Sequence, residues 1–82
     1  MKTGKYYAYV LYSVKNSSLY IGSTNDLEKR FFQHNIGKVA STKPYRPYRL
    51  IYVEEFATRA DAFNREKELK LSAGRRYLKQ FI

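Results

Sequence analysis

The stretch that decides the fold is Tyr20-Ile21-Gly22-Ser23-Thr24-Asn25-Asp26-Leu27, where an extended pattern changes into a helical one. A β-like run at 19–23 ends here, and Asn25 is a residue type that caps helices, with Glu28 at the reciprocal capping position. Asp26 suits the positive end of a helix dipole, and Gly37 is a natural stop. The stretch therefore predicts a strand followed directly by a helix that ends near Gly37.

A second extended run precedes this stretch. Residues 5–14 are rich in Tyr and Val, and the turn-prone pair Asn16-Ser17 separates them from 19–23, which predicts a hairpin. A turn centred on that pair places Val14 opposite Leu19. The period of two in a strand then puts four residues on one face of the hairpin: Tyr9, Leu11, Tyr20 and Gly22.

The pattern continues after Gly37 with a loop, a strand and two helices. Residues 37–47 carry two prolines and several cations, which favours an irregular basic loop. Residues 48–56 read as a third strand, and Thr58 can cap a helix over 59–71. Ser72-Ala73-Gly74 is expected to break that helix before a short terminal one. The whole chain, 1–82, is therefore expected to be one small α+β domain with helices packed on a sheet.

The charge of the chain narrows the class of partner. Sixteen Lys and Arg against seven Asp and Glu give a formal net charge of +9, which attracts polyanions, so nucleic acid is the leading partner class. No apolar run of membrane-spanning length is present, and a membrane is not an expected partner. The start Met1-Lys2-Thr3-Gly4-Lys5 has no apolar secretory core, and the chain has no cysteine, so we expect a cytoplasmic protein.

Two helical positions project polar groups together beside the core. Arg30 and His34 are four residues apart and adjoin the apolar stripe of Leu27 and Phe31, so both side chains point the same way. Two structural alternatives stay open at this point. Arg30 can instead pair with Asp26, four residues earlier, and a lone histidine beside an apolar stripe is often a hydrogen-bonded scaffold residue.

The second helix carries an acidic residue within an apolar stripe. Glu66 stands at helical spacing among Ala62, Phe63 and Leu69, and a carboxylate there needs a partner because burial of an unpaired charge is unfavourable. A metal ion is one such partner. An ion pair with Lys70, four residues later, is the alternative.

Cations gather in the middle of the chain. From Lys29 to Arg49 there are six Lys or Arg and no Asp or Glu, which in so basic a chain favours a surface that faces phosphate. The residues expected to contact nucleic acid are Lys29, Lys38, Lys43, Arg46, Arg49, Arg75 and Arg76.

The spacing of these residues resembles a known family. Tyr20 stands eleven residues after Tyr9, Arg30 ten residues after Tyr20, and His34 one helical turn further. Together with Ile21, Gly22 and a downstream helical glutamate, this pattern is similar to that of the GIY-YIG nucleases, and in particular to their small stand-alone UPF0213-like members. The resemblance covers Tyr6 to Ile82. It implies a three-stranded antiparallel sheet with about three flanking helices, and hydrolysis of DNA with a divalent metal, usually Mg.

The resemblance also implies roles for individual residues. Tyr9 and Tyr20 match the tyrosines of the two half-motifs, with Ile21 and Gly22 completing the second. Arg30 matches the arginine at the scissile phosphate, His34 the nearby histidine or tyrosine, and Glu66 the metal ligand. Two positions depart from the pattern: Tyr7-Ala8-Tyr9 replaces Gly-Ile-Tyr, and Leu78-Lys79-Gln80 stands where many members carry an asparagine.

The chemistry of these residue types agrees with those roles. Arginine presents a permanently charged fork that suits phosphate oxygens, histidine is eligible as a base near neutral pH, and one carboxylate with waters is enough to hold magnesium. Tyr9 is the preferred general base and Tyr20 positions it or the water, although an exchange of these two roles fits the sequence equally well.

The sequence therefore leaves three hypotheses, in order of preference. The first is a metal-dependent DNA endonuclease that selects DNA structure and acts in repair or processing, with no recognisable element for reading bases. The second is a nucleic-acid-binding module of the same fold with little or no turnover, for which RNA is also an eligible ligand. The third is a protein-interaction domain whose charge serves solubility. A protein that recruits so small a domain to its substrate fits the first two.

Overall fold

The computed structural model describes residues 5–82, and in it one antiparallel sheet carries the helices. The strands are β1 (Tyr6–Ser13), β2 (Leu19–Thr24) and β3 (Tyr48–Phe56), in the order β2-β1-β3. The helices are α1 (Leu27–Asn35), α2 (Arg59–Leu69) and α3 (Ser72–Leu78), with 3₁₀ turns at Lys43–Tyr45 and Lys79–Phe81. This arrangement confirms the predicted α+β fold. The expectation that the first four residues contain no secretory signal lies outside the described residues.

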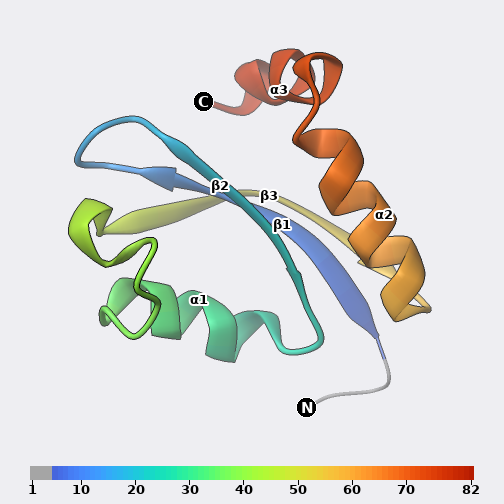
Figure 1. Cartoon of the computed structure of the whole chain (residues 1–82), viewed down its shortest axis with the longest axis horizontal. Coiled ribbons are helices and arrows are strands. Elements are labelled where there is room, and N and C mark those ends of the chain that lie inside the picture. The colour runs from blue at the N-terminus through green and yellow to red at the C-terminus, as the bar shows by residue number, and fades with distance from the viewer. Residues whose placement is uncertain (1–4) are drawn as a thin grey trace.

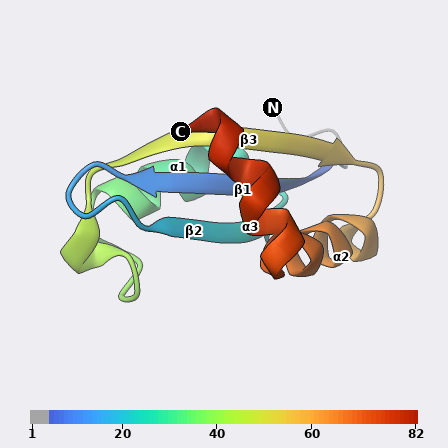
Figure 2. The same cartoon turned by 90° about the horizontal axis from the view of Figure 1, so that it is seen from above.

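Alternate residues of the central strand build two separate cores. Ala8 and Val10 point to one face, where they pack with Leu69 of α2 and Leu78 of α3. Tyr9 and Leu11 point to the other face, which α1 covers with Leu27 and Phe31. Figure 1 shows α1 below the sheet and α3 above it, and Figure 2 shows α3 crossing the strands on the side opposite α1.

The hairpin has the predicted faces but a register shifted by two residues. Leu19 pairs with Tyr12, and Val14, its predicted partner, donates its backbone N–H to the carbonyl of Pro47 at 2.9 Å instead. A hydrogen bond of 2.8 Å from Ser13 N to Ser18 O closes the turn, so Ser13 is the last residue of β1 before it, and Ser17 adopts a positive φ of 66°. Because a shift of two keeps each residue on its face, Tyr9 and Gly22 share a face as predicted, and the observed register places them directly opposite each other.

The first helix begins one residue later than the capping pattern suggested. Asp26, and not Asn25, is the N-cap, and its carboxylate accepts from Lys29 N at 3.3 Å. Thr24 causes this shift, since its Oγ1 accepts from Asp26 N at 3.1 Å and sets the turn before the helix. Gly37 does end the helix, with a φ of +87° and a bond from Lys38 N to Gln33 O of 3.0 Å.

The basic loop after α1 is anchored to the sheet. Thr42 is only 1% exposed, and Ser13 of β1 donates its hydroxyl to the carbonyl of Tyr45 at 2.6 Å. Asn35 at the end of α1 also bonds Tyr48 through both backbone groups, accepting from its N–H at 2.7 Å and donating to its carbonyl at 3.3 Å. The loop is thus irregular, as predicted, but it is held in a defined place beside α1.

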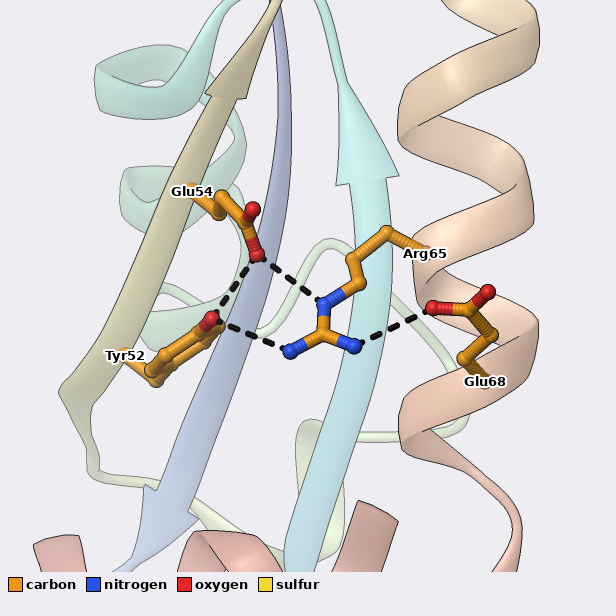
Figure 3. A network of polar contacts seen from close by, with 4 residues as sticks. All are labelled: Tyr52, Glu54, Arg65 and Glu68. Atoms are coloured by element: carbon orange, nitrogen blue, oxygen red, sulfur yellow. Dashed lines mark hydrogen bonds and ion pairs between the residues drawn. The ribbon is translucent and has the colours of Figure 1, made fainter.

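The second helix is tied to the sheet by a polar network that Figure 3 shows. Arg65 donates to Glu54 of β3 at 3.0 Å and to Glu68 at 3.1 Å, and the Tyr52 hydroxyl donates to Glu54 at 2.8 Å. Thr58 caps α2, as predicted, by accepting from Asp61 N at 3.1 Å. The network fixes the orientation of α2 about its own axis.

Two predictions about the C-terminal helices are wrong. The break falls at Lys70 and Leu71, and Ser72-Ala73-Gly74 forms the first turn of α3. Phe63 does not belong to the buried stripe of α2: Ala62 and Leu69 are buried, whereas Phe63 is 48% exposed, with the Lys67 ammonium 5.1 Å from its ring. The turn of 100° from Ala62 to Phe63 is enough to carry the ring out of the interface.

No helix within residues 5–82 has both the length and the apolar character that crossing a membrane requires.

Candidate active site

Aromatic rings from four elements meet on the α1 face of the sheet. Tyr9 of β1, Tyr20 of β2 and Tyr48 of β3 surround His34 of α1, with ring centroids 5.9, 4.6 and 6.4 Å from the imidazole. Tyr9 is 1% exposed and His34 is fully buried. The structure therefore brings together both predicted tyrosines and the predicted histidine, and it adds Tyr48, which no motif in the sequence indicated.

The polar atoms of this cluster form a chain of hydrogen bonds. Tyr9 Oη lies 3.0 Å from His34 Nε2, and His34 Nδ1 lies 2.9 Å from Thr42 Oγ1. Thr42 in turn donates to the carbonyl of Val39 at 3.3 Å. Both ring nitrogens of His34 are thus bonded inside the protein, as the scaffold interpretation requires, while one of them faces the phenol proposed for catalysis.

Arg30 lies close to these hydrogen-bonded groups, and its charge acts to lower the pKa of both Tyr9 and His34. Its charge opposes the burial and the neighbouring Tyr20 that together raise the pKa of Tyr9 to about 12. Burial, and then the charge of Arg30, lowers the pKa of His34 to about 4. At neutral pH Tyr9 is therefore a phenol and His34 a neutral imidazole. The guanidinium also donates to Gln33 at 3.3 Å, so a neighbour on α1 helps to orient it.

Gly22 is required because of a neighbouring side chain. A change from strand to helix predicts a need for backbone freedom, yet the constraint is the neighbouring phenol. A Cβ on Gly22 would lie 2.8 Å from Tyr9 Oη and 3.1 Å from Tyr20 Cε2. The absence of a side chain at this position is what allows the Tyr9 ring to lie across β2 and reach His34.

Glu66 reaches the same strand from α2. Its side chain is 13% exposed, Oε1 accepts from the Ser23 hydroxyl at 2.8 Å, and Oε2 pairs with Lys70 at 2.8 Å. Its charge contributes to the raised pKa of Tyr9, so the carboxylate acts on the phenol across Gly22. The ion pair that the sequence offered as an alternative is therefore formed.

The donor set around Glu66 suits a hard divalent cation that takes most of its ligands from elsewhere. Within residues 5–82 no group of three or more His, Cys, Asp or Glu could hold a metal ion. One carboxylate with waters and substrate oxygens is how magnesium is often bound, and Lys70, at 49% exposure, is free to swing away from Oε2. Glu66 thus fits as a single protein ligand, with Ser23 orienting it.

A polar pocket opens beside this site at the turn between β2 and α1. Its lining residues are Ser23, Thr24, Asn25, Asp26, Lys29, Arg30, Gln33 and Arg59. Arg59, the first residue of α2, was not predicted. The local sequence pattern does not indicate that the start of α2 lies close to the end of β2. Its guanidinium lies 5.1 Å from the Tyr6 ring.

All seven residues expected to contact nucleic acid are exposed, but they are distributed over both faces. Lys29 lines the polar pocket with Arg30, while Lys43 and Arg46 line a second pocket with Lys15. Lys38 and Arg49 lie on the loop after α1 and on β3. Arg75 and Arg76 belong to α3, which lies on the side of the sheet opposite α1 (Figure 2).

Two further residues of the site gave no signal in the sequence. Thr42 sits in a loop whose composition indicates only irregular structure, and its bond to His34 spans eight residues. Ser23 lies within β2 and bonds a carboxylate 43 residues away. Both contacts depend on tertiary packing and follow no local spacing.

The comparisons with known proteins agree with this geometry. The family model of the GIY-YIG catalytic domain matches residues 5–78. The chain belongs to the GIY-YIG family. As the resemblance in its motifs implied, it is a small GIY-YIG chain of the UPF0213 kind and therefore a member of a nuclease family.

Several relatives match this GIY-YIG chain over most of their length. UPF0213 protein SSP2268 of Staphylococcus saprophyticus is 42% identical over 76 residues, 92% of each chain. UPF0213 protein YazA of Bacillus subtilis is 44% identical over 71 residues, 85% of this chain and 71% of its own. The solution NMR structure of UPF0213 protein BH0048 from Bacillus halodurans has a TM-score of 0.54 at 35% identity, covering 93% of this chain and 80% of that one.

Proposed function

We propose that this chain is a divalent-cation-dependent endonuclease that hydrolyses phosphodiester bonds in DNA, recognises DNA structure and not base sequence, and serves DNA repair or processing. The observation that carries the proposal is that Tyr9, Arg30 and His34 lie together beside Gly22 of β2, and that Glu66 bonds Ser23 of the same strand. They offer a proton acceptor, a phosphate-binding cation and a hard metal ligand, contributed by β1, α1 and α2.

Arg30 has the electrostatic role in this proposal. Its planar fork matches two oxygens of a phosphodiester and stabilises the negative charge that grows as water attacks. Its place in a polar pocket with Lys29 and Arg59 supports a backbone phosphate as the ligand there. Lysine, a point charge without the fork, would be a poor replacement.

Tyr9 and His34 share the role of base. A phenol with a pKa of about 12 is not ionised at neutral pH, so Tyr9 accepts a proton efficiently only while it passes its own proton on. His34 Nε2, at 3.0 Å, is the acceptor. As the water oxygen bonds to phosphorus, its proton moves to Tyr9 and the Tyr9 proton to His34. The bond to the leaving sugar oxygen breaks, solvent protonates that oxygen, and His34 returns its proton to solvent.

Tyr20 has a positioning role. Its ring packs on His34 at 4.6 Å, whereas the hydroxyl of Tyr9 makes the bond to the imidazole. Of the two assignments that fit the sequence, this geometry supports Tyr9 as the proton-transferring tyrosine. The negative charge of a bound phosphate would also act to raise the pKa of His34 toward its ordinary range.

Glu66 would hold the divalent cation, with Ser23 keeping Oε1 in place and Lys70 displaced from Oε2. A bound cation would polarise the phosphate and stabilise the leaving oxygen. Lys70 Nζ lies 2.8 Å from Oε2 in the ion pair, so this side chain would have to move when the cation binds.

Cleavage assays test this proposal. A panel of single-stranded, duplex, flapped and junction DNA is incubated with and without magnesium, using the native chain, Arg30→Ala, Arg30→Lys and Glu66→Ala. We expect magnesium-dependent cleavage by the native chain and losses of about 10² to 10³-fold in the Arg30 variants. We expect none detectable with Glu66→Ala, which should still bind DNA. Glu55→Ala, an exposed strand carboxylate, is the matched control and should cleave normally.

The formed Glu66–Lys70 pair favours a second candidate, a nucleic-acid-binding module in which Lys70 permanently neutralises the carboxylate. Under that function the native chain binds every DNA form with strong salt dependence and cleaves none. Cleavage that Glu66→Ala leaves unchanged would instead remove the metal role while keeping the enzyme. Absence of nucleic-acid binding at low salt would point to the protein-interaction alternative.

A further inference from the structure

A chain of hydrogen bonds runs from Tyr9 through His34 and Thr42 to the carbonyl of Val39. The carbonyl at its end indicates in which direction the protons of the chain point. The carbonyl of Val39 can only accept, and Thr42 Oγ1 lies 3.3 Å from it. A hydroxyl has one proton to donate, and a Thr42 that gives this proton to Val39 turns a lone pair toward His34. The group 2.9 Å away must then donate, which requires a proton on His34 Nδ1.

The opposite end of the chain requires the same direction. Arg30 interacts with the Tyr9 hydroxyl, and a guanidinium has no acceptor, so the proton of Tyr9 needs another partner. His34 Nε2, at 3.0 Å, accepts it only when that nitrogen is unprotonated. The reverse tautomer would leave the Tyr9 proton facing donors on both sides in a buried place, which is unfavourable.

We propose that Thr42 is a positioning residue that holds His34 in the Nδ1–H tautomer and so keeps Nε2 free to receive the proton of Tyr9. The catalytic meaning of this rests on the proposed function, because the tautomer matters for turnover only if Tyr9 passes a proton to His34. Thr42 itself is buried behind the imidazole and acts through it. The hydrogen bond at one ring nitrogen decides which tautomer the other nitrogen presents.

The fold makes Thr42 suited to this task. Its own backbone N–H bonds the Val39 carbonyl at 3.1 Å, and Lys43 N bonds the same carbonyl at 2.9 Å, so a tight turn fixes the hydroxyl relative to its acceptor. Asn35 fixes the helix that carries His34, because its side chain joins the end of α1 to the backbone of Tyr48. The imidazole therefore meets an oriented hydroxyl in place of mobile water.

Nitrogen NMR of the imidazole ring tests the proposal without any activity. The chain has one histidine, so the ring signals belong to His34. At neutral pH the native protein should show a protonated Nδ1 and an unprotonated Nε2. Thr42→Val, which keeps the shape and removes the hydroxyl, should move the population toward the Nε2–H form. Thr42→Ser should retain the native pattern. A native Nε2–H tautomer, or a Thr42→Val spectrum equal to the native one, would overturn the proposal.

Cleavage then links the tautomer to function. With the divalent cation supplied at saturation, Thr42→Val should lower kcat about 10²-fold with little change in KM, and Thr42→Ser should stay within about twofold of the native chain. Should Thr42→Val fail to fold, the native spectrum and Thr42→Ala still decide the tautomer. A native chain that shows the Nδ1–H tautomer but cleaves nothing removes the proposed function and leaves the role of Thr42 in place. If Thr42→Val changes the tautomer and leaves kcat unchanged, Thr42 has no role in turnover.

Discussion

At the residue scale, the site works by the surroundings it gives to ordinary side chains. Tyr9 and His34 have pKa values that burial moves in opposite directions, to about 12 and about 4. Each shift keeps the group neutral, and a neutral phenol bonded to a neutral imidazole can remain buried without an unpaired charge. The same burial makes His34 a group that links the stability of the fold to pH.

Stability should fall as the solution is made acidic through the range of that histidine. The pKa of His34 is 6.5 when the chain is unfolded and about 4 when it is folded. Between these values the unfolded chain binds more protons, so the free energy of unfolding decreases as pH falls from 6.5 to 4 and is fully retained above 6.5. The contribution of this one group is about 3 kcal/mol.

Urea unfolding at pH 7, 5.5 and 4 measures this effect. The comparison is with His34→Gln, whose amide can bond both Tyr9 and Thr42 but does not titrate. Other groups titrate alike in both chains, so the difference between their pH profiles isolates His34. Parallel profiles for the native chain and His34→Gln would show that the imidazole titrates normally in the fold.

At the element scale, the place of Glu66 depends on how α2 is held. Arg65 bonds Glu54 of β3, and the next residue, Glu66, bonds Ser23 of β2. Two adjacent side chains of α2 therefore form hydrogen bonds to two different strands of the sheet. Figure 3 shows the first of these contacts. The packing of α3 against the end of α2 completes the support, and Gly74 is the residue that allows it.

Gly74→Ala should destabilise the protein even though alanine is the better helix former. A Cβ at Gly74 would lie against the carbonyl oxygen of Glu68 and 2.5 Å from Leu69 Cα, and main-chain atoms cannot rotate aside. We expect a loss of about 1 to 3 kcal/mol in the free energy of unfolding. Denaturant titration measures it, with Ala73→Gly as the neighbouring control for propensity alone. A more stable Gly74→Ala chain would mean that α3 does not pack this closely on α2.

At the scale of the whole molecule, the chain has a net charge of +9, and cations of the described residues lie on both faces of the sheet. Lys29 stands beside Arg30 in the polar pocket, and Lys43 lines a pocket on the loop that follows α1. Arg75 and Arg76 lie on α3, which packs on the other face (Figure 1). A duplex that presents a phosphate to Arg30 meets the first pair more readily than the second.

The salt dependence of DNA binding should distinguish the two pairs. Removing Lys29 and Lys43 together should make the slope of log K against log salt less steep by about two, since each lost phosphate contact removes about one. The matched double variant of Arg75 and Arg76 removes the same charge and should change the slope less. Fluorescence anisotropy of a labelled duplex at several salt concentrations measures both. Equal changes would mean that bound DNA also reaches the α3 face.

Much of the molecule follows from local patterns. The three strands, the cap at Thr58, the stop at Gly37 and the common face of Tyr9 and Tyr20 were predictable, because period-two alternation and capping chemistry act within a few residues. The positions that went wrong are those where a distant group competes. Pro47 takes the N–H of Val14 and changes the hairpin register, and Thr24 moves the start of α1 to Leu27.

The sequence by itself determined the family, the two-faced sheet and the residue types of the site, because these follow from spacing and from the alternation of side chains along a strand. Only the tertiary structure decided that Tyr9 lies across Gly22 and that Thr42 bonds the far side of His34. The same holds for Glu66, which Ser23 and Lys70 share. The Tyr9 and Ser23 contacts join residues far apart in the chain, and the Thr42 contact joins a loop to α1. Burial makes each group depend on the partner that packing supplies.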